Sequence, residues 1–255
     1  MFQPISASAV GKVILIGEHA AVYGRPAIAL PVRQVAVTVQ IRPTTQAADL
    51  HINAPQIGLD ASLGTLPAGH PLRNAIERIT SLFALPTLSS AEMDITSTIP
   101  VAAGMGSSAA LAVGLTRAML AYFGRAASVE EVSEAAFEIE KHQHGTPSGL
   151  DNSVIAHERC VYFRKDQPIE YLRPGRQFHF VIANSGISAS TKEVVASVRN
   201  QASQNPEKFT ALFDRIGGLS QRARTALESG QEARLGLAMN DCHAALKELT
   251  VSSAE

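Results

Sequence analysis

The stretch Pro100-Val101-Ala102-Ala103-Gly104-Met105-Gly106-Ser107-Ser108-Ala109-Ala110-Leu111 lies between an expected strand and an expected helix. Residues 91–99 partly alternate between apolar and polar side chains, and residues 107–123 are apolar almost all round. Glycines let backbone amides approach a ligand closely, and a helix N-terminus carries partial positive charge. The stretch therefore predicts a phosphate-binding loop that opens a buried helix. It is not a Walker A loop, because the chain contains no G-x-x-x-x-G-K-[ST] pattern. The competing interpretation is a purely structural glycine turn.

The composition is typical of a soluble globular protein. The chain has 255 residues, 45% hydrophobic content, 18% charge and a net charge of −1. This balance gives no reason to expect nucleic acid or an anionic membrane as a partner. No apolar run is long enough for a membrane span, and no secretory signal is evident. Cys160 and Cys242 are isolated and are expected to be reduced thiols, so we expect a cytoplasmic protein.

Patterns along the chain favour an α+β fold, because strands and helices mix without regular βαβ alternation. We expect one short strand and loops over 44–66, and loop structure over 145–152. Ser128-Val129-Glu130-Glu131 predicts a capping box at a helix start. A composition shift near 168–175 predicts a boundary between domains 1–172 and 173–255. Strands are expected at 5–16, 28–41, 91–99, 160–163 and 178–183, and helices at 71–83, 107–123, 128–144, 191–204, 206–229 and 231–249.

Two further clusters of polar residues carry potential chemistry. Lys12, Glu18 and His19 flank an apolar strand and its exit turn. Glu140 lies near a helix end, and a Pro/Gly turn then returns the chain to Asp151. Two such carboxylates can converge on one cavity, where one binds Mg²⁺ and the other orients or deprotonates a hydroxyl. The competing interpretations are a solvated strand edge and an Asx-stabilised turn.

The His142-Gln143-His144 pair has no third ligand at a recognisable spacing, so we expect solvated or structural histidines rather than zinc ligands. A phosphate loop, two carboxylates and a lysine together match the needs of phosphoryl transfer, namely anion neutralisation, a metal and an oriented nucleophile.

The sequence resembles the GHMP kinases, and within that family the branch that phosphorylates mevalonate. Residues 9–24, with the core Gly11-Lys12-Val13-Ile14-Leu15-Ile16-Gly17-Glu18-His19, match the family's opening motif, although Val10 stands where Pro is more frequent. The glycine loop matches the phosphate motif P-x-x-x-G-[LM]-G-S-S-A. His144-Gly145-Thr146-Pro147-Ser148-Gly149-Leu150-Asp151-Asn152 points to the mevalonate branch. Residues 183–193 resemble its segment at the start of the second domain.

This resemblance implies a two-domain α+β GHMP kinase fold with the active site between the domains. The N-terminal domain is expected to be ribosomal-protein-S5-domain-2-like and the C-terminal domain ferredoxin-like but incomplete. The implied activity is ATP-dependent phosphorylation of mevalonate in isoprenoid biosynthesis. The implied partners are mevalonate, ATP and Mg²⁺, with no nucleic acid or membrane, and the implied oligomer is a homodimer.

The resemblance also implies roles for individual residues. Asp151 is expected to face the substrate hydroxyl, and Lys12 to pair with Asp151 and keep it ionised. Glu140 and a loop serine, Ser108 in preference to Ser107, are expected to hold Mg²⁺. ATP is expected over the loop residues and helix start, and mevalonate in a pocket lined from both domains. The ATP-binding residues are Gly104, Met105, Gly106, Ser107, Ser108 and Ala109; the substrate-binding residues are Glu18, His19 and Thr191.

One family motif has no counterpart here. The glycine-rich stretch G-A-K-x-[ST]-G-x-G-x-G-G near the family's C-terminus is missing from the sequence. The interpretations are a shortened product of a longer gene, which we favour, and a natural short form with altered function. We expect the 255-residue form to be less stable and less active than a longer one. Alternative functions are another GHMP kinase, acting on phosphomevalonate, homoserine or a sugar, and a catalytically silent metabolite-binding relative.

Overall fold

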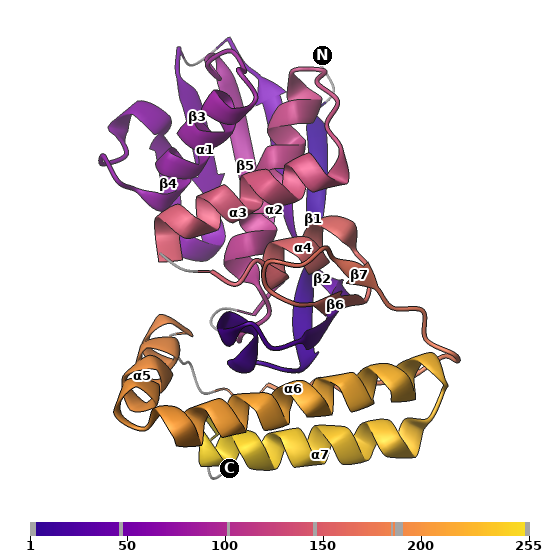
Figure 1. Cartoon of the computed structure of the whole chain (residues 1–255). Helices are drawn as coiled ribbons and strands as arrows, with labels where there is room; N and C mark the ends of the chain where they lie inside the picture. Colours follow the sequence, from indigo (N-terminus) through magenta and orange to yellow (C-terminus); the bar gives the residue numbers. More distant parts are fainter. Residues whose placement is uncertain are drawn as a thin grey trace.

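The computed structural model describes residues 4–45, 48–100, 103–144, 147–184, 186 and 191–252, with the backbone alone at 143, 144, 191 and 192. Its architecture is α+β, as predicted (Figure 1). The strands are β1 (Ile5–Ile16), β2 (Ala27–Pro43), β3 (Leu50–Ala54), β4 (Leu59–Ser62), β5 (Ala91–Ser97), β6 (Val161–Phe163) and β7 (Glu170–Tyr171). The α-helices are α1 (Pro71–Leu82), α2 (Ser107–Tyr122), α3 (Val129–His144), α4 (Leu150–His157), α5 (Thr191–Gln204), α6 (Pro206–Glu228) and α7 (Glu232–Glu248), and 3₁₀ turns lie at η1 (Ala20–Tyr23), η2 (Pro55–Ile57) and η3 (Leu63–Thr65).

The long strand β2 organises a 7-stranded sheet in the order β4-β3-β5-β2-β6-β7, with β1 also paired to β2. β1 runs antiparallel to β2 from the Ile5–Ile41 pair to the Ile16–Ile28 pair. Val37, Val39 and Ile41 of β2 are buried, as their alternation with polar residues predicts. This pairing fixes the position of Lys12 in the sheet. It also fixes where the turn after Ile16 begins.

Helix α2 fills the centre of the core, as expected from its apolar character. It packs on β1 and β2 and lies beside α3. Gly114 brings the helix close to the sheet, since a Cβ there would lie 3.5 Å from Val39 Cγ2. Helix α2 therefore lies directly against the strand that carries Lys12.

The helical segments α5, α6 and α7 form a second layer below the sheet in Figure 1. The side chains of α6 and α7 share a hydrophobic cluster with Ile16 and Ile28 of the sheet and with Ala20 of η1. The helices therefore contact the exit of β1 directly, close to the predicted substrate residues.

Several local predictions are confirmed. Helices α1, α2, α3, α5, α6 and α7 lie within one or two residues of their predicted bounds. The predicted capping box forms at the start of α3, where the Ser128 amide donates to the Glu131 carboxylate at 2.7 Å and the Glu131 amide donates to Ser128 Oγ at 3.1 Å. Cys160 and Cys242 are both free thiols.

Three local predictions are wrong. Residues 150–152 begin helix α4 rather than ending a loop, because Gly149 adopts a φ of 88° and starts the helix there. Two strands, β3 and β4, occupy the 44–66 region instead of one. Residues 178–183 form no strand, and Val181 is 97% exposed. A segment with strand-like sequence forms a strand only where a neighbouring strand can pair with its backbone. No described residue after Tyr171 belongs to a strand.

None of the helices in the described part of the chain combines the length and apolar character that a bilayer crossing needs. The division into domains 1–172 and 173–255 stays a proposal.

Candidate active site

The glycine loop has the geometry of an anion-binding turn. Gly104 and Gly106 have φ values of 70° and 75°, and Gly106 directly precedes the first residue of α2. A Cβ on Gly106 would lie 2.8 Å from Lys12 Cγ and 3.0 Å from Ile155 Cδ1. The loop is tied to the sheet because the Lys12 amide donates to Met105 O at 3.0 Å. Glycine is thus required at 106, and the N-terminus of α2 lies directly beside Lys12.

Lys12 and Asp151 form an ion pair at the same place. Lys12 Nζ lies 3.1 Å from Asp151 Oδ1, and their side chains are 7% and 38% exposed. A buried ammonium group is strongly unfavourable without a partner, so this pair holds the cation in place. The ion pair joins β1 to the first turn of α4 and leaves part of the Asp151 carboxylate open to a ligand.

Helix α4 is itself held against α3 by a buried amide. Asn152 Nδ2 donates to both the backbone oxygen and Oγ of Ser133, each at 3.0 Å. Asn152 and Ser133 are both buried, so the contact fixes how α4 is rotated on α3. Sequence analysis missed this role, although Asn152 belongs to the same motif as Asp151.

Ser108 and Glu140 form the second polar pair of the site. The Ser108 hydroxyl donates a hydrogen bond to Glu140 Oε1. Glu140 is on α3 and 8% exposed. An alcohol and a buried carboxylate are hard oxygen donors, which Mg²⁺ prefers, and this ion takes one or two carboxylates with phosphates and water. The pair therefore fits a Mg²⁺ bound together with a polyphosphate. Among the described residues, no group of three or more histidine, cysteine or acidic side chains is arranged so that it could hold a metal ion.

Glu18 and His19 lie in the tight turn after β1. Burial raises the pKa of the Glu18 carboxyl, against the lowering effect of backbone hydrogen bonds and of the Lys12 charge. Glu18 Oε2 is buried and has no hydrogen-bond partner among the described residues. Burial also lowers the pKa of His19. The turn therefore presents a buried carboxyl and an imidazole that favours its neutral form.

A substitution at Glu18 tests this electrostatic description. A carboxyl whose pKa is raised on folding contributes stability below its ordinary pKa, and this contribution is lost as the pH rises through the folded-state pKa. Glu18→Gln removes the cost of burying the ionised carboxylate. It should therefore raise Tm at pH 8 by about 2–4 °C for each kcal/mol by which the folded state is stabilised. The gain should disappear below about pH 4.5, the ordinary pKa of a glutamate carboxyl. Thermal unfolding at several pH values measures it, and a gain independent of pH would contradict the assignment.

Two expectations fall partly outside the described residues. Thr191 begins α5, and its side chain is not among those described, as is also true of His144. Gly145 and Thr146 of the branch motif lie outside the described residues altogether. The structure describes the other predicted residues. Lys12, Asp151 and Gly106 lie together, and Ser108 contacts Glu140. Gly104, Met105, Ser107 and Ala109 line the turn and the start of α2.

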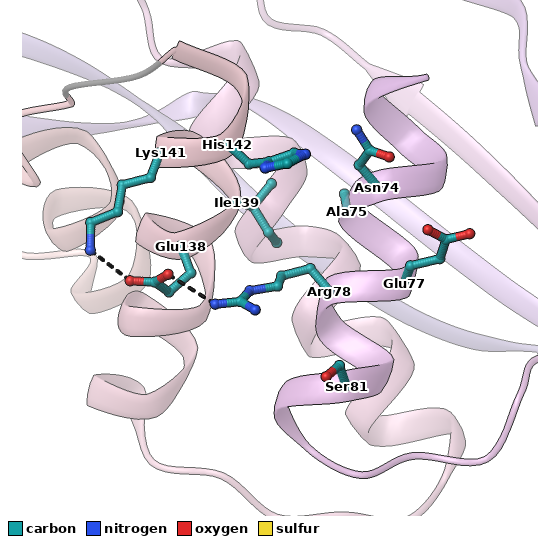
Figure 2. Close-up of a pocket in the computed structure, with 9 residues that line it drawn as sticks. All are labelled: Asn74, Ala75, Glu77, Arg78, Ser81, Glu138, Ile139, Lys141 and His142. Carbon is teal, nitrogen blue, oxygen red and sulfur yellow. Dashed lines mark hydrogen bonds and ion pairs between the residues drawn. The ribbon is translucent and has the colours of Figure 1, made fainter. Parts of the chain in front are cut away.

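A cavity of about 520 Å³ lies elsewhere, between α1 and α3 (Figure 2). Arg78 of α1 and Lys141 of α3 both reach Glu138, at 3.0 and 2.7 Å, and His142 lies nearby at the rim (Figure 2). Both cations of this cavity are thus already paired with a carboxylate, and none of the predicted catalytic or metal-binding residues lines it. The site described above is the better candidate for phosphate chemistry.

Comparison with known proteins places the chain in a family. Residues 72–158 match the model of the GHMP kinases N terminal domain. Mevalonate kinase from Pyrococcus furiosus is 32% identical over 98% of this chain and 79% of its own length. Mevalonate kinase from Thermococcus sibiricus is 33% identical over the same shares. The chain belongs to the GHMP kinase family. The resemblance predicted from the motifs is thereby confirmed.

Solved structures agree with this family. This GHMP kinase superposes on the crystal structure of L. major mevalonate kinase in complex with R-mevalonate with a TM-score of 0.73 and 25% identity, over 100% of this chain and 80% of that one. A crystal structure of another mevalonate kinase gives a TM-score of 0.77 at 21% identity, over 98% and 81%. The second likeness shows the GHMP kinase fold.

Proposed function

We propose that this GHMP kinase transfers the γ-phosphoryl group of ATP to the primary hydroxyl of mevalonate, giving 5-phosphomevalonate for isoprenoid biosynthesis. The observation that carries the proposal is the Lys12–Asp151 ion pair of 3.1 Å beside the N-terminus of α2. The substrate follows from the two archaeal relatives, both mevalonate kinases matched over 98% of this chain.

The glycine loop binds the triphosphate in this proposal. Backbone amides at the start of a helix donate hydrogen bonds to phosphate oxygens, and the helix dipole favours their negative charge. Gly104 is exposed and has open space around its Cα, and Gly106 leads into the helix. The polyphosphate therefore lies across residues 104–109, with its terminal group toward Lys12.

Lys12 and Asp151 act on the transferred group and its acceptor. The Lys12 ammonium neutralises charge on the phosphoryl oxygens during transfer. The open part of the Asp151 carboxylate accepts a hydrogen bond from the mevalonate hydroxyl and orients an oxygen lone pair toward phosphorus. Phosphoryl transfer has a loose transition state, so orientation and charge neutralisation contribute more than early removal of the hydroxyl proton. The proton passes to Asp151 as the new P–O bond forms and the bond between the γ-phosphorus and the β,γ-bridging oxygen breaks, which releases ADP.

Ser108 and Glu140 hold Mg²⁺ in this proposal. Bound there, Mg²⁺ would supply positive charge that neutralises the phosphate groups. Glu140 is fixed by α3 and Ser108 by the first turn of α2, so the two ligands approach from two rigid elements.

Glu18, His19 and Thr191 line the mevalonate pocket in this proposal. The support is their place in the chain: Glu18 and His19 follow the strand that carries Lys12, and Thr191 opens α5 in the second layer. Division at residue 172 and homodimerisation remain proposals from the family resemblance. Sedimentation velocity should give a species of about twice the 27.0 kDa chain mass, and a monomer at all concentrations would contradict the dimer.

The test of substrate is ADP release from Mg-ATP with four acceptors, namely mevalonate, phosphomevalonate, homoserine and galactose. We expect release with mevalonate alone. Release with another acceptor would assign a different kinase activity, and binding of mevalonate without release would indicate a silent metabolite-binding relative. Either result would overturn the proposal.

A further inference from the structure

The turn that carries Glu18 and His19 has a strained backbone. His19 has φ 61° and ψ −44°, and the Ala20 amide donates to Glu18 O at 2.7 Å. These values define a γ-turn of the rare kind with positive φ at its central residue. A non-glycine residue keeps such a conformation only where the surrounding structure holds it. Something outside the turn must therefore fix the backbone at His19.

Helix α6 contacts the residues that directly follow this turn. The ring of Phe213 stacks on Tyr23 with centroids 4.1 Å apart and planes 15° from parallel. Arg25 Nε donates to Asp214 Oδ1 at 3.0 Å, and Arg25 Nη1 donates to Tyr23 O at 2.6 Å. Figure 1 shows this turn, at the indigo end of the chain, lying directly on α6. The C-terminal end of the 3₁₀ turn η1 and Arg25 just beyond it are thus attached to one helix.

The backbone of α6 approaches the same segment closely. A Cβ on Gly217 would lie 3.0 Å from Arg25 Cγ and 3.3 Å from Pro26 Cδ. Positions 213, 214 and 217 lie on one side of an α-helix. A stacked ring, an ion pair and a glycine contact therefore meet the Tyr23–Pro26 segment from a single helical face.

We propose that Tyr23, Phe213, Arg25 and Asp214 are positioning residues, through which α6 holds the strained turn so that Glu18 and His19 meet the acceptor substrate. The inference rests on the proposed function for the identity of that substrate. These residues touch neither the glycine loop nor Lys12 in any described contact. Loosening them should therefore weaken use of mevalonate and spare ATP.

Steady-state kinetics separates the two substrates. Tyr23→Leu removes the stacked ring. It should raise KM for mevalonate about two- to tenfold, which is the interaction energy of an aromatic pair expressed as a ratio of KM values. Asp214→Asn should raise it about two- to fivefold, the ratio for an exposed ion pair. KM for ATP should stay within about twofold in both variants, since binding at a separate site is not affected.

Two matched controls guard against a general loss of structure. Tyr23→Phe keeps the ring and should retain the wild-type KM for mevalonate. Arg215→Gln removes the neighbouring α6 ion pair to Glu248, at 2.7 Å, which does not touch the turn. It should leave both KM values unchanged. Equal effects of Asp214→Asn and Arg215→Gln, or equal effects on mevalonate and ATP, would overturn the proposal.

A second readout does not depend on turnover. The His19 ring can be followed by proton–carbon NMR, with His19→Gln to assign its signal. Tyr23→Leu and Asp214→Asn should move the pKa of His19 up toward its ordinary value, because the ring loses burial, and Arg215→Gln should not. An unchanged His19 titration would refute the positioning role. If the wild type shows no turnover with mevalonate, the proposed function fails, and this titration still decides the role of α6.

Discussion

Asp151→Asn should lower kcat for mevalonate phosphorylation by about 10²- to 10⁴-fold, the range for loss of a positioned acid–base group. The amide has nearly the shape of the carboxylate but cannot accept the hydroxyl proton. It also removes the charge that faces Lys12 Nζ at 3.1 Å. The Kd for ATP should stay within about twofold, because the loop amides are unchanged. Single-turnover kinetics and calorimetric titration of ATP measure the two effects.

The matched control for this variant lies just after the same helix. Glu158 is 34% exposed and pairs with Arg117 Nη1 at 3.0 Å, so Glu158→Gln also removes an ion pair from the α4 region. It should retain wild-type kcat. Thermal unfolding of both variants accounts for any loss of stability from the unpaired Lys12 ammonium. Near-normal turnover by Asp151→Asn would remove Asp151 from the mechanism.

Glu140→Gln should produce the second large effect, a fall in kcat/KM of at least about 10²-fold at millimolar Mg²⁺. A neutral amide binds Mg²⁺ far less well than a carboxylate. The half-saturating Mg²⁺ concentration for ATP binding should rise about tenfold or more, which calorimetric titration of a non-hydrolysable ATP analogue measures without turnover. Ser108→Ala should shift the same concentration in the same direction by less.

The control is Glu138→Gln, two positions earlier on α3. Glu138 faces the cavity between α1 and α3 and pairs with Arg78 and Lys141 (Figure 2). Its loss should leave the Mg²⁺ dependence unchanged. If Glu138→Gln raised the Mg²⁺ requirement and Glu140→Gln did not, the metal would belong to that cavity.

Much of the site was predictable because its chemistry lies in short ordered motifs. Lys12 lies within a strand and the glycine loop leads into a helix, and the type of both elements follows from their sequence patterns. Their meeting point was not predictable from periodicity, because it depends on β1 pairing with β2 and on α4 packing against α3. The resemblance to the GHMP kinases supplied that information.

The errors have local causes. The start of α4 was missed because Pro147 and Gly149 suggested a loop, although Leu150, Val154 and Ile155 have helical spacing. Residues 178–183 have strand character but no strand beside them among the described residues. The local sequence does not indicate the γ-turn at His19, because its backbone is held by contacts from α6, about 190 residues later in the chain.

The most direct test of the central claim is identification of the product by phosphorus NMR after incubation of the chain with Mg-ATP and mevalonate. We expect one new phosphomonoester, coupled to the protons of the primary carbon of mevalonate, in an amount equal to the ADP formed. We also expect this signal to be lost in Asp151→Asn. Formation of ADP with inorganic phosphate alone, or an undiminished phosphomonoester signal in Asp151→Asn, would contradict the claim.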